Sequence, residues 1–204
     1  MLRLKTRSKH RTRWDANGAA PAAAEVFSTE LGWMAVAHCE GVLCGLVFGH
    51  RSVSSATQAL RRMLGADTAM VDNVREGEQP AGSIGGLVGR LRRFAAGEPV
   101  DFRDVPIDER HLTPFGRRVV AACRRIRLGQ TRTYGRLAAV CGAPGAARAV
   151  GQVMARNRYP LVVPCHRVVA ACGVLGGFSA PQGLAMKRRL LALESRTLGV
   201  LASS

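Results

Sequence analysis

The chain has 204 residues, of which 47% are hydrophobic, and its 30 Lys and Arg against 14 Asp and Glu give a formal net charge of +16. This length suits one large domain or two small ones, with enough apolar sequence to bury a core without disulfides or metals. The chain lacks a run of eighteen apolar residues, and polar residues follow its basic start. We therefore expect neither a membrane span nor a secretory signal.

The basic residues are unevenly distributed. Residues 111–204 contain 15 Lys and Arg and a single acid, Glu194, whereas residues 15–110 contain 9 basic and 13 acidic residues. A strongly basic folded unit attracts polyanions, and this asymmetry predicts that the second half binds nucleic acid. General solubility would not explain so uneven a split.

The cysteines predict a reduced, cytoplasmic protein without metal. The six of them form no CxxC pair and lie mostly in apolar surroundings; they are Cys39, Cys44, Cys123, Cys141, Cys165 and Cys172. Cys39 and Cys44 have only His38 and His50 nearby, which is not a zinc-binding spacing. We expect no metal and no cofactor.

The first half of the chain predicts a small α/β domain. Residues 1–24 are basic and then rich in Ala and Pro, which is typical of a disordered tail. From residue 26 to 48, apolar runs broken at Leu31-Gly32 and Glu40-Gly41 predict three strands joined by hairpin turns.

Two helices and a linker are expected to complete this half. Apolar spacing predicts helices over 56–64 and 84–96. Residues 97–110 carry two prolines and several acids, which favours a linker. The N-terminal domain is therefore assigned to residues 25–96 and the C-terminal domain to residues 111–204.

The C-terminal domain begins with a helical pattern that favours DNA binding. Thr113 followed by Pro114 predicts a capped helix start, and the apolar stripe is Val119, Val120, Cys123 and Ile126. Thr133 predicts the cap of a short helix over 134–140, and a Gly/Pro turn separates it from another helix over 146–156. Such a pair indicates a helix-turn-helix, with an ordinary bundle as the alternative, and the positive charge favours DNA.

An apolar run from Pro160 to Val163 predicts a strand that Pro164 stops, directly before Cys165 and His166. A bend at Pro164 could bring both side chains to one pocket, where the histidine could assist the thiol. The alternative is a buried structural cysteine beside a surface histidine, and the pair alone favours this alternative.

Two further features lie after Cys165. The glycine-rich segment 172–183 predicts a loop that closes over a flat ligand, or else a plain surface connection. A helix is expected over 184–194, so Glu194 would end it and oppose the helix dipole unless a partner such as a histidine compensates. An exposed glutamate opposite Arg189 or Arg196 is equally compatible with the spacing.

Three segments resemble the O6-alkylguanine-DNA alkyltransferase family in order and spacing. They are Thr133-Tyr134-Gly135-Arg136-Leu137-Ala138, Ala147-Arg148-Ala149-Val150-Gly151 and Pro164-Cys165-His166-Arg167-Val168. The resemblance is close over residues 112–198 and looser over residues 26–108. It implies an α+β fold, with a ribonuclease-H-like N-terminal domain and a winged-helix-like helix-turn-helix domain.

The resemblance also implies a catalytic set. Cys165 would take the alkyl group from O6 of a flipped guanine and keep it, so each protein would act once. His166 would be the base, acting through a water and oriented by Glu194. Asn157 would tie the recognition helix to the active-site turn. This is an activated nucleophile with a base held by a third group.

Four more residues would bind the substrate by the same resemblance. Tyr134 would crowd the target phosphate and donate a proton toward the base, and Arg148 would fill the vacated stack. Ser179 would contact the O6 side of guanine, and the Val168 carbonyl would accept from its exocyclic amine. Chemistry at O6 within a duplex requires the base to leave the stack.

The implied partner is double-stranded DNA carrying O6-alkylguanine, with O4-alkylthymine as a further candidate substrate, and the protein would act as a monomer. Phe178 stands where the family commonly has tyrosine, and the loop at residues 180–183 is two residues longer than the shorter family version. A non-enzymatic winged-helix protein that binds alkylated DNA is the main alternative. A cysteine hydrolase ranks last, because no oxyanion-hole motif is apparent.

Overall fold

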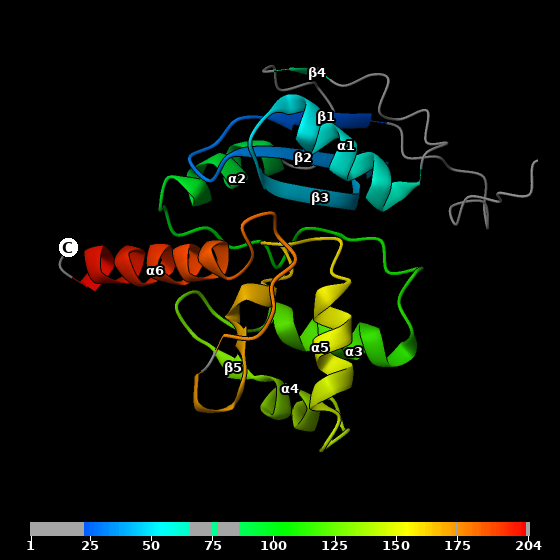
Figure 1. Cartoon of the computed structure of the whole chain (residues 1–204), viewed down its shortest axis with the longest axis vertical. Coiled ribbons are helices and arrows are strands. Elements are labelled where there is room, and N and C mark those ends of the chain that lie inside the picture. Colours follow the sequence, from blue (N-terminus) through cyan, green and yellow to red (C-terminus); the bar gives the residue numbers. More distant parts are fainter. Residues whose placement is uncertain (1–22, 66–74, 77–85, 174, 203–204) are drawn as a thin grey trace, which may run out of the picture.

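The computed structural model describes residues 23–65, 75–76, 86–173 and 175–202, and its fold is mixed α+β (Figure 1). Residues 1–22 of the predicted tail lie outside the described residues, and its last two residues are not disordered, because the first strand of the sheet begins at Ala23. The N-terminal part is a sheet with strand order β3-β2-β1-β4, and the C-terminal part is mainly helical.

The two predicted hairpins are present in the sheet. Its strands are β1 (Ala23–Phe27), β2 (Trp33–Cys39), β3 (Val42–His50) and β4 (Arg75–Glu76). The first three pair antiparallel, and β4 pairs parallel with β1. Glu40 at φ 49° and Gly41 at φ 79° form the second turn in the left-handed region, which glycine adopts without strain.

Successive side chains of each strand point to opposite faces of the sheet, and both faces are buried. One face packs Ala35, Ala37 and their neighbours against α1 (Val53–Leu64). The other face carries Met34 and Val36 and shares a core with α2 (Leu87–Ala95) and the C-terminal part. Helix α1 begins three residues before the predicted start, because Ser52 caps it: the Ser55 amide donates to Ser52 Oγ at 3.2 Å.

The segment 97–110 contains no helix, but it is fixed at several points. The Leu43 amide donates to the Pro106 carbonyl, and the Asp108 amide donates to the Leu43 carbonyl, both at 2.9 Å. On the other side, the Arg124 guanidinium donates to three carbonyls, those of Phe102, Arg103 and Val105. This segment therefore joins the sheet edge to the first C-terminal helix.

The remaining elements follow in chain order: α3 (Pro114–Arg124), β5 (Arg132–Thr133), α4 (Tyr134–Val140), α5 (Ala147–Ala155), a 3-10 turn at Cys165–Arg167, β6 (Val168–Val169), a second 3-10 turn at Ala171–Gly173, and α6 (Gly183–Ala202). Both predicted caps are confirmed, since Thr113 Oγ1 accepts from the Gly116 amide and Thr133 Oγ1 accepts from the Arg136 amide. Helix α3 ends before Ile126, which is nonetheless buried.

The predicted end of the last helix is wrong. Helix α6 continues from Gly183 to Ala202, so Glu194 lies well inside it rather than at its C-terminus. The helix-dipole argument for a compensating partner therefore does not apply, and the reason for a carboxylate at this position is a set of tertiary contacts.

Candidate active site

The backbone around Cys165 is shaped by Pro164, as predicted, but no strand precedes it. Residues 159–163 form a turn closed by the Val163 amide and the Tyr159 carbonyl at 2.7 Å, with buried Leu161 at φ 72°. Pro164 has φ −77° and ψ 65°, and the Cys165 amide donates to the Val163 carbonyl at 2.7 Å. This is an inverse γ-turn, which the fixed φ of proline favours.

A single 3-10 turn, Cys165–Arg167, follows and directs neighbouring side chains to different surroundings. Cys165 lines an open hollow, whereas His166 is 1% exposed, does not line that hollow and contacts Glu194 of α6. The expectation that both side chains face one pocket is therefore wrong, because a 3-10 turn spreads successive residues around its axis.

His166, Arg167 and Glu194, with the Gly129 amide, form a buried cluster that we call the Glu194 cluster. Glu194 Oε1 lies 2.7 Å from His166 Nε2 and 2.8 Å from Arg167 Nη2, and Oε2 accepts from the Gly129 amide at 3.0 Å. Glu194 is 1% exposed, which excludes the surface pairing with Arg189 or Arg196. The predicted contact between Glu194 and a histidine is present.

The Glu194 cluster sets the protonation of its members. Burial raises the pKa of the Glu194 carboxyl, but hydrogen bonds and charge from His166 and Arg167 outweigh burial and lower that pKa to about 2. Burial lowers the pKa of His166, and Glu194 only partly offsets this effect. His166 is therefore neutral at pH 7. Because an ionised carboxylate only accepts, Nε2 carries the proton and Nδ1 has a lone pair.

The Cys165 thiol is held largely protonated. Burial raises its pKa, while the Asn157 side chain, the charge of Lys187 and the backbone amides of Cys165 and His166 oppose the rise. Asn157 also holds the turn, since its Nδ2 donates to the Val163 carbonyl at 2.9 Å and its Oδ1 accepts from the Tyr159 amide at 3.0 Å. The thiol consequently needs a base when it reacts.

Cys165 opens onto a hollow of about 910 Å³, which we call the active-site hollow. Three of the predicted substrate residues also line it: Tyr134 from the start of α4, Arg148 from the start of α5, and Ser179 from the glycine-rich loop. The structure thus brings Tyr134, Arg148, Ser179 and Cys165 around one opening. A Cβ at position 176 would lie 2.9 Å from Tyr134 Oη, so the loop can pack against the Tyr134 ring only because residue 176 is glycine.

Val168 is buried. Its carbonyl already accepts a hydrogen bond from Lys187, a residue that the sequence analysis does not single out. Lys187 is 0% exposed; its Nζ donates to the Val168 carbonyl at 2.6 Å and lies 5.9 Å from the centre of the Tyr134 ring. A carbonyl oxygen has two lone pairs, so Val168 can accept a second hydrogen bond. Lys187 stands seven residues before Glu194, hence on the same helix face, and this spacing is the signal that could have identified it.

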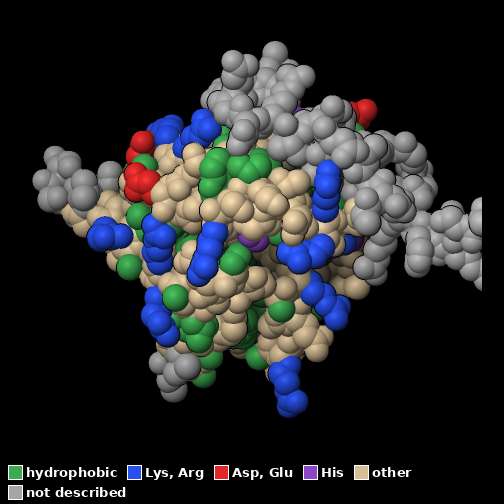
Figure 2. Space-filling model, turned by 45° about the horizontal axis from the view of Figure 1, so that its top comes forward, with side chains coloured by type: hydrophobic (Ala, Val, Ile, Leu, Met, Phe, Trp, Pro, Cys, Tyr) green, Lys and Arg blue, Asp and Glu red, His purple; other side chains and the backbone are tan. Residues whose placement is uncertain are grey.

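The surface around this region is basic. On the face in Figure 2, Lys and Arg side chains are spread over both the upper and the lower part, whereas the acidic side chains in view lie near the top. Helices α4 and α5 contact each other closely and also pack on α3. The N-terminus of α5 places Arg148, which is exposed, at the rim of the active-site hollow.

Among the described residues, no group of three His, Cys, Asp or Glu side chains could hold a metal ion. Five cysteines in the described part of the chain are free thiols: Cys39, Cys44, Cys123, Cys141 and Cys165. No helix within the described ranges is both long and apolar enough to cross a membrane.

Comparison with known proteins identifies the family. Residues 114–196 match the family model described as 6-O-methylguanine DNA methyltransferase, DNA binding domain. A methylated-DNA–protein-cysteine methyltransferase of Methanopyrus kandleri is 47% identical over 104 residues, which span 51% of this chain and 75% of the relative. The chain belongs to the methylated-DNA–protein-cysteine methyltransferase family. Another member, from Mycolicibacterium paratuberculosis, is 46% identical over 114 residues, or 56% of this chain and 67% of the relative.

The fold also resembles a solved structure of the methyltransferase family. The crystal structure of Mycobacterium tuberculosis OGT in complex with DNA aligns with a TM-score of 0.66 and 33% identity, covering 86% of this chain and 94% of that chain. The similarity to this methyltransferase therefore extends beyond the C-terminal segment and includes the sheet.

Proposed function

We propose that the protein repairs DNA by moving an alkyl group from O6 of guanine to Cys165, once per molecule. The observation that carries this proposal is the position of Cys165: it lines an open hollow, while the next residue, His166, is buried and lies 2.7 Å from Glu194. Membership of the methylated-DNA–protein-cysteine methyltransferase family supports the same reaction.

In the proposed reaction, the thiol proton passes to His166 through a water, and the sulfur attacks the alkyl carbon bound to O6. The S–C bond forms as the C–O6 bond breaks. The Tyr134 hydroxyl donates a proton to the departing guanine and regains one from solvent. Neutral His166 with an unprotonated Nδ1 suits a base, because Nδ1 has no hydrogen-bond partner among the described residues. The thioether is stable, so the cysteine is consumed.

Substrate binding is proposed to use base flipping. The active-site hollow is large enough for a purine, and O6 of a stacked, paired guanine is out of reach of a thiol. Arg148 would occupy the space that the base leaves, and Tyr134 would lie against the target phosphate. Ser179 would contact O6, and the Val168 carbonyl would accept from the exocyclic amine beside its bond to Lys187.

The finer architecture belongs to the same proposal. We assign residues 25–96 to a ribonuclease-H-like domain and residues 111–204 to a winged-helix-like domain that binds double-stranded DNA as a monomer. The close packing of α4 on α5, and the basic C-terminal half, support a helix-turn-helix in which α5 is the recognition helix.

Restoration of guanine in a duplex that contains O6-methylguanine tests the proposal. The wild type should restore guanine in proportion to the amount of protein added, and Cys165→Ala should restore none. Cys141→Ala is the matched control, since Cys141 is also buried in the C-terminal half but does not line the hollow, and it should behave as wild type. If neither wild type nor Cys165→Ala restored guanine while both bound the lesion duplex alike, the protein would be a non-enzymatic binder.

A further inference from the structure

A second hollow of about 610 Å³ adjoins the active-site hollow and is not used by the proposed reaction with a methyl group. The two share Ala155, Phe178 and Ser179 among their lining residues, so they meet at the glycine-rich loop. The second hollow extends from there between β3, α1 and the segment after α5.

The floor of the second hollow is apolar and supported by the N-terminal sheet. Phe178 packs edge-on against Phe48 of β3, with ring centroids 6.2 Å apart and an interplanar angle of 68°. Ala180 and Pro181, from the lengthened part of the loop, line the same hollow. Gln182 Nε2 donates to the Gly49 carbonyl at 3.4 Å, which ties the loop to the end of β3. The longer loop therefore forms one wall of the second hollow.

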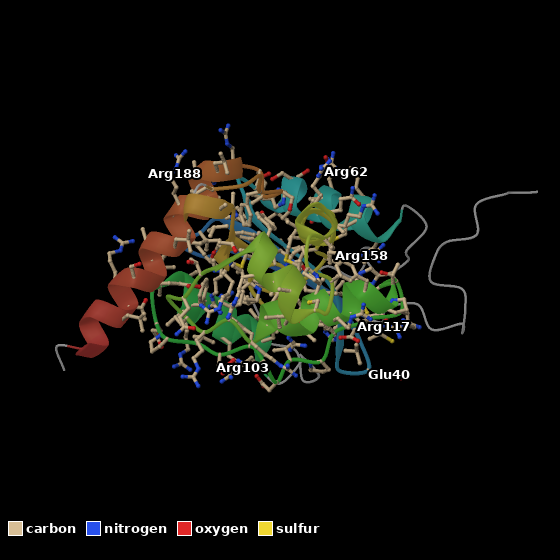
Figure 3. All side chains as sticks on the ribbon, turned by 90° about the horizontal axis from the view of Figure 1, so that it is seen from below. Glu40, Arg62, Arg103, Arg117, Arg158 and Arg188 are labelled. Atoms are coloured by element: carbon tan, nitrogen blue, oxygen red, sulfur yellow. The ribbon has the colours of Figure 1, made fainter. Side chains whose placement is uncertain are left out.

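The rim of the second hollow is cationic. Arg62 from α1 and Arg156 and Arg158 after α5 line it, and no acid is among its described lining residues. Figure 3 places Arg62 and Arg158 on one side of the molecule and Arg188 on the other. His50 also lines this hollow, and burial and the charge of Arg62 lower its pKa, so the arginines supply the charge at neutral pH.

We propose that the second hollow receives the distal part of O6 adducts that carry an alkyl chain ending in a carboxylate. The inference rests on the proposed function, since it concerns the group transferred to Cys165. The chain would pass Phe178 and lie on the apolar floor beside Phe48, and the carboxylate would meet Arg62 and Arg158. Apolar surface followed by guanidinium groups is complementary to the whole of such a chain, whereas a neutral chain of equal length would match only the apolar part and a methyl group would reach neither part.

Single-turnover rates on three duplexes test this assignment. The duplexes carry O6-methylguanine, O6-(carboxybutyl)guanine, or the neutral amide of the same carboxybutyl group. The wild type should react faster with the carboxylate than with its amide. The double variant Arg62→Gln/Arg158→Gln should remove this preference, on the order of tenfold for two charge-assisted contacts, and leave the methyl rate unchanged. Arg188→Gln removes one exposed charge outside both hollows and should keep the preference.

Rates on the three duplexes distinguish the proposed function from the further inference. If the wild type fails to transfer even the methyl group, the proposed function itself is wrong. If methyl transfer proceeds but the carboxylate and amide react alike, the inference is overturned and the function stands. If the double variant slows all three substrates equally, the arginines bind DNA phosphates instead, which also overturns the inference.

A steric variant supplies a second measurement. Ala59 lines the second hollow from α1, and Ala59→Phe would place a ring in it. This variant should slow both long adducts and spare the methyl group. Equal rates for the long adducts in Ala59→Phe and wild type would contradict the assignment.

Discussion

Replacing Glu194 by glutamine is expected to destabilise the protein strongly, because Glu194 is the only anion in a buried group of donors. His166 Nε2, Arg167 Nε and Nη2, and the Gly129 amide all point at its two oxygens. Glutamine has one acceptor oxygen, and its NH₂ group would face another donor. The substitution therefore leaves the buried Arg167 guanidinium without a counter-charge.

Two estimates of the free energy of unfolding lost in Glu194→Gln agree in magnitude. Removing one partner of a buried ion pair typically costs about 3–5 kcal/mol. The pKa of Glu194 falls from 4.5 to about 2, and each pKa unit corresponds to about 1.36 kcal/mol, which gives about 3 kcal/mol. In a chain of this size about 1 kcal/mol shifts Tm by about 2–4 °C, so Tm should fall on the order of 10 °C.

The assay is denaturant unfolding at several pH values, with Glu98→Gln as control. Glu98 pairs with Arg93 at 2.6 Å on the surface, and such exposed pairs contribute about 1 kcal/mol or less. Because the pKa of Glu194 is depressed, its contribution is complete above pH 4.5 and is lost as pH falls toward about 2. The difference in free energy of unfolding between wild type and Glu194→Gln should therefore decrease over that pH range. Equal destabilisation by the two variants, or a stability difference independent of pH, would contradict this role of Glu194.

Three further outcomes follow from the site. Lys187→Met should slow transfer, because the charge that lowers the pKa of Cys165 is lost; a pH–rate profile should place the variant's thiol pKa above that of wild type, and an unshifted profile would contradict this role. Gly176→Ala should raise the lesion concentration needed for half-maximal rate, since the new Cβ would meet Tyr134 at 2.9 Å, while thermal unfolding should change little. In wild type, the transfer rate should be level across the neutral range and fall only in acid, because the reacting pair is a protonated Cys165 thiol and a neutral His166, and burial raises the pKa of the thiol and lowers that of the histidine; a rate that falls with rising pH would exclude this assignment of thiol and base.

Local chemistry explains which parts of this structure the sequence could predict. Thr113 and Thr133 begin helices because a threonine side chain can satisfy a free amide three residues ahead, and this needs no tertiary information. The hairpin turn at Glu40-Gly41 and the bend at Pro164 are likewise determined by residues within the turn. Such features were predicted close to their observed bounds.

Features that depend on distant partners were predicted poorly. Glu194 was placed at a helix end, although its buried position depends on Arg167 and on the amide of Gly129, which lie far away in the chain. The sequence alone indicates no role for Lys187, since only the fold shows that the Val168 carbonyl and the Tyr134 ring lie beside it. The apolar run before Pro164 predicts a strand rather than the observed turn, because apolar residues alone do not reveal the left-handed Leu161.

The central claim is that Cys165 is a consumable alkyl acceptor. Intact mass measurement after incubation with excess O6-methylguanine duplex, followed by peptide mapping, tests it most directly. We expect a gain of one methyl group per protein, located on the peptide that holds Cys165, with no further guanine restored once every molecule is modified. An unmodified protein, a methyl group on another residue, or continued turnover would contradict it.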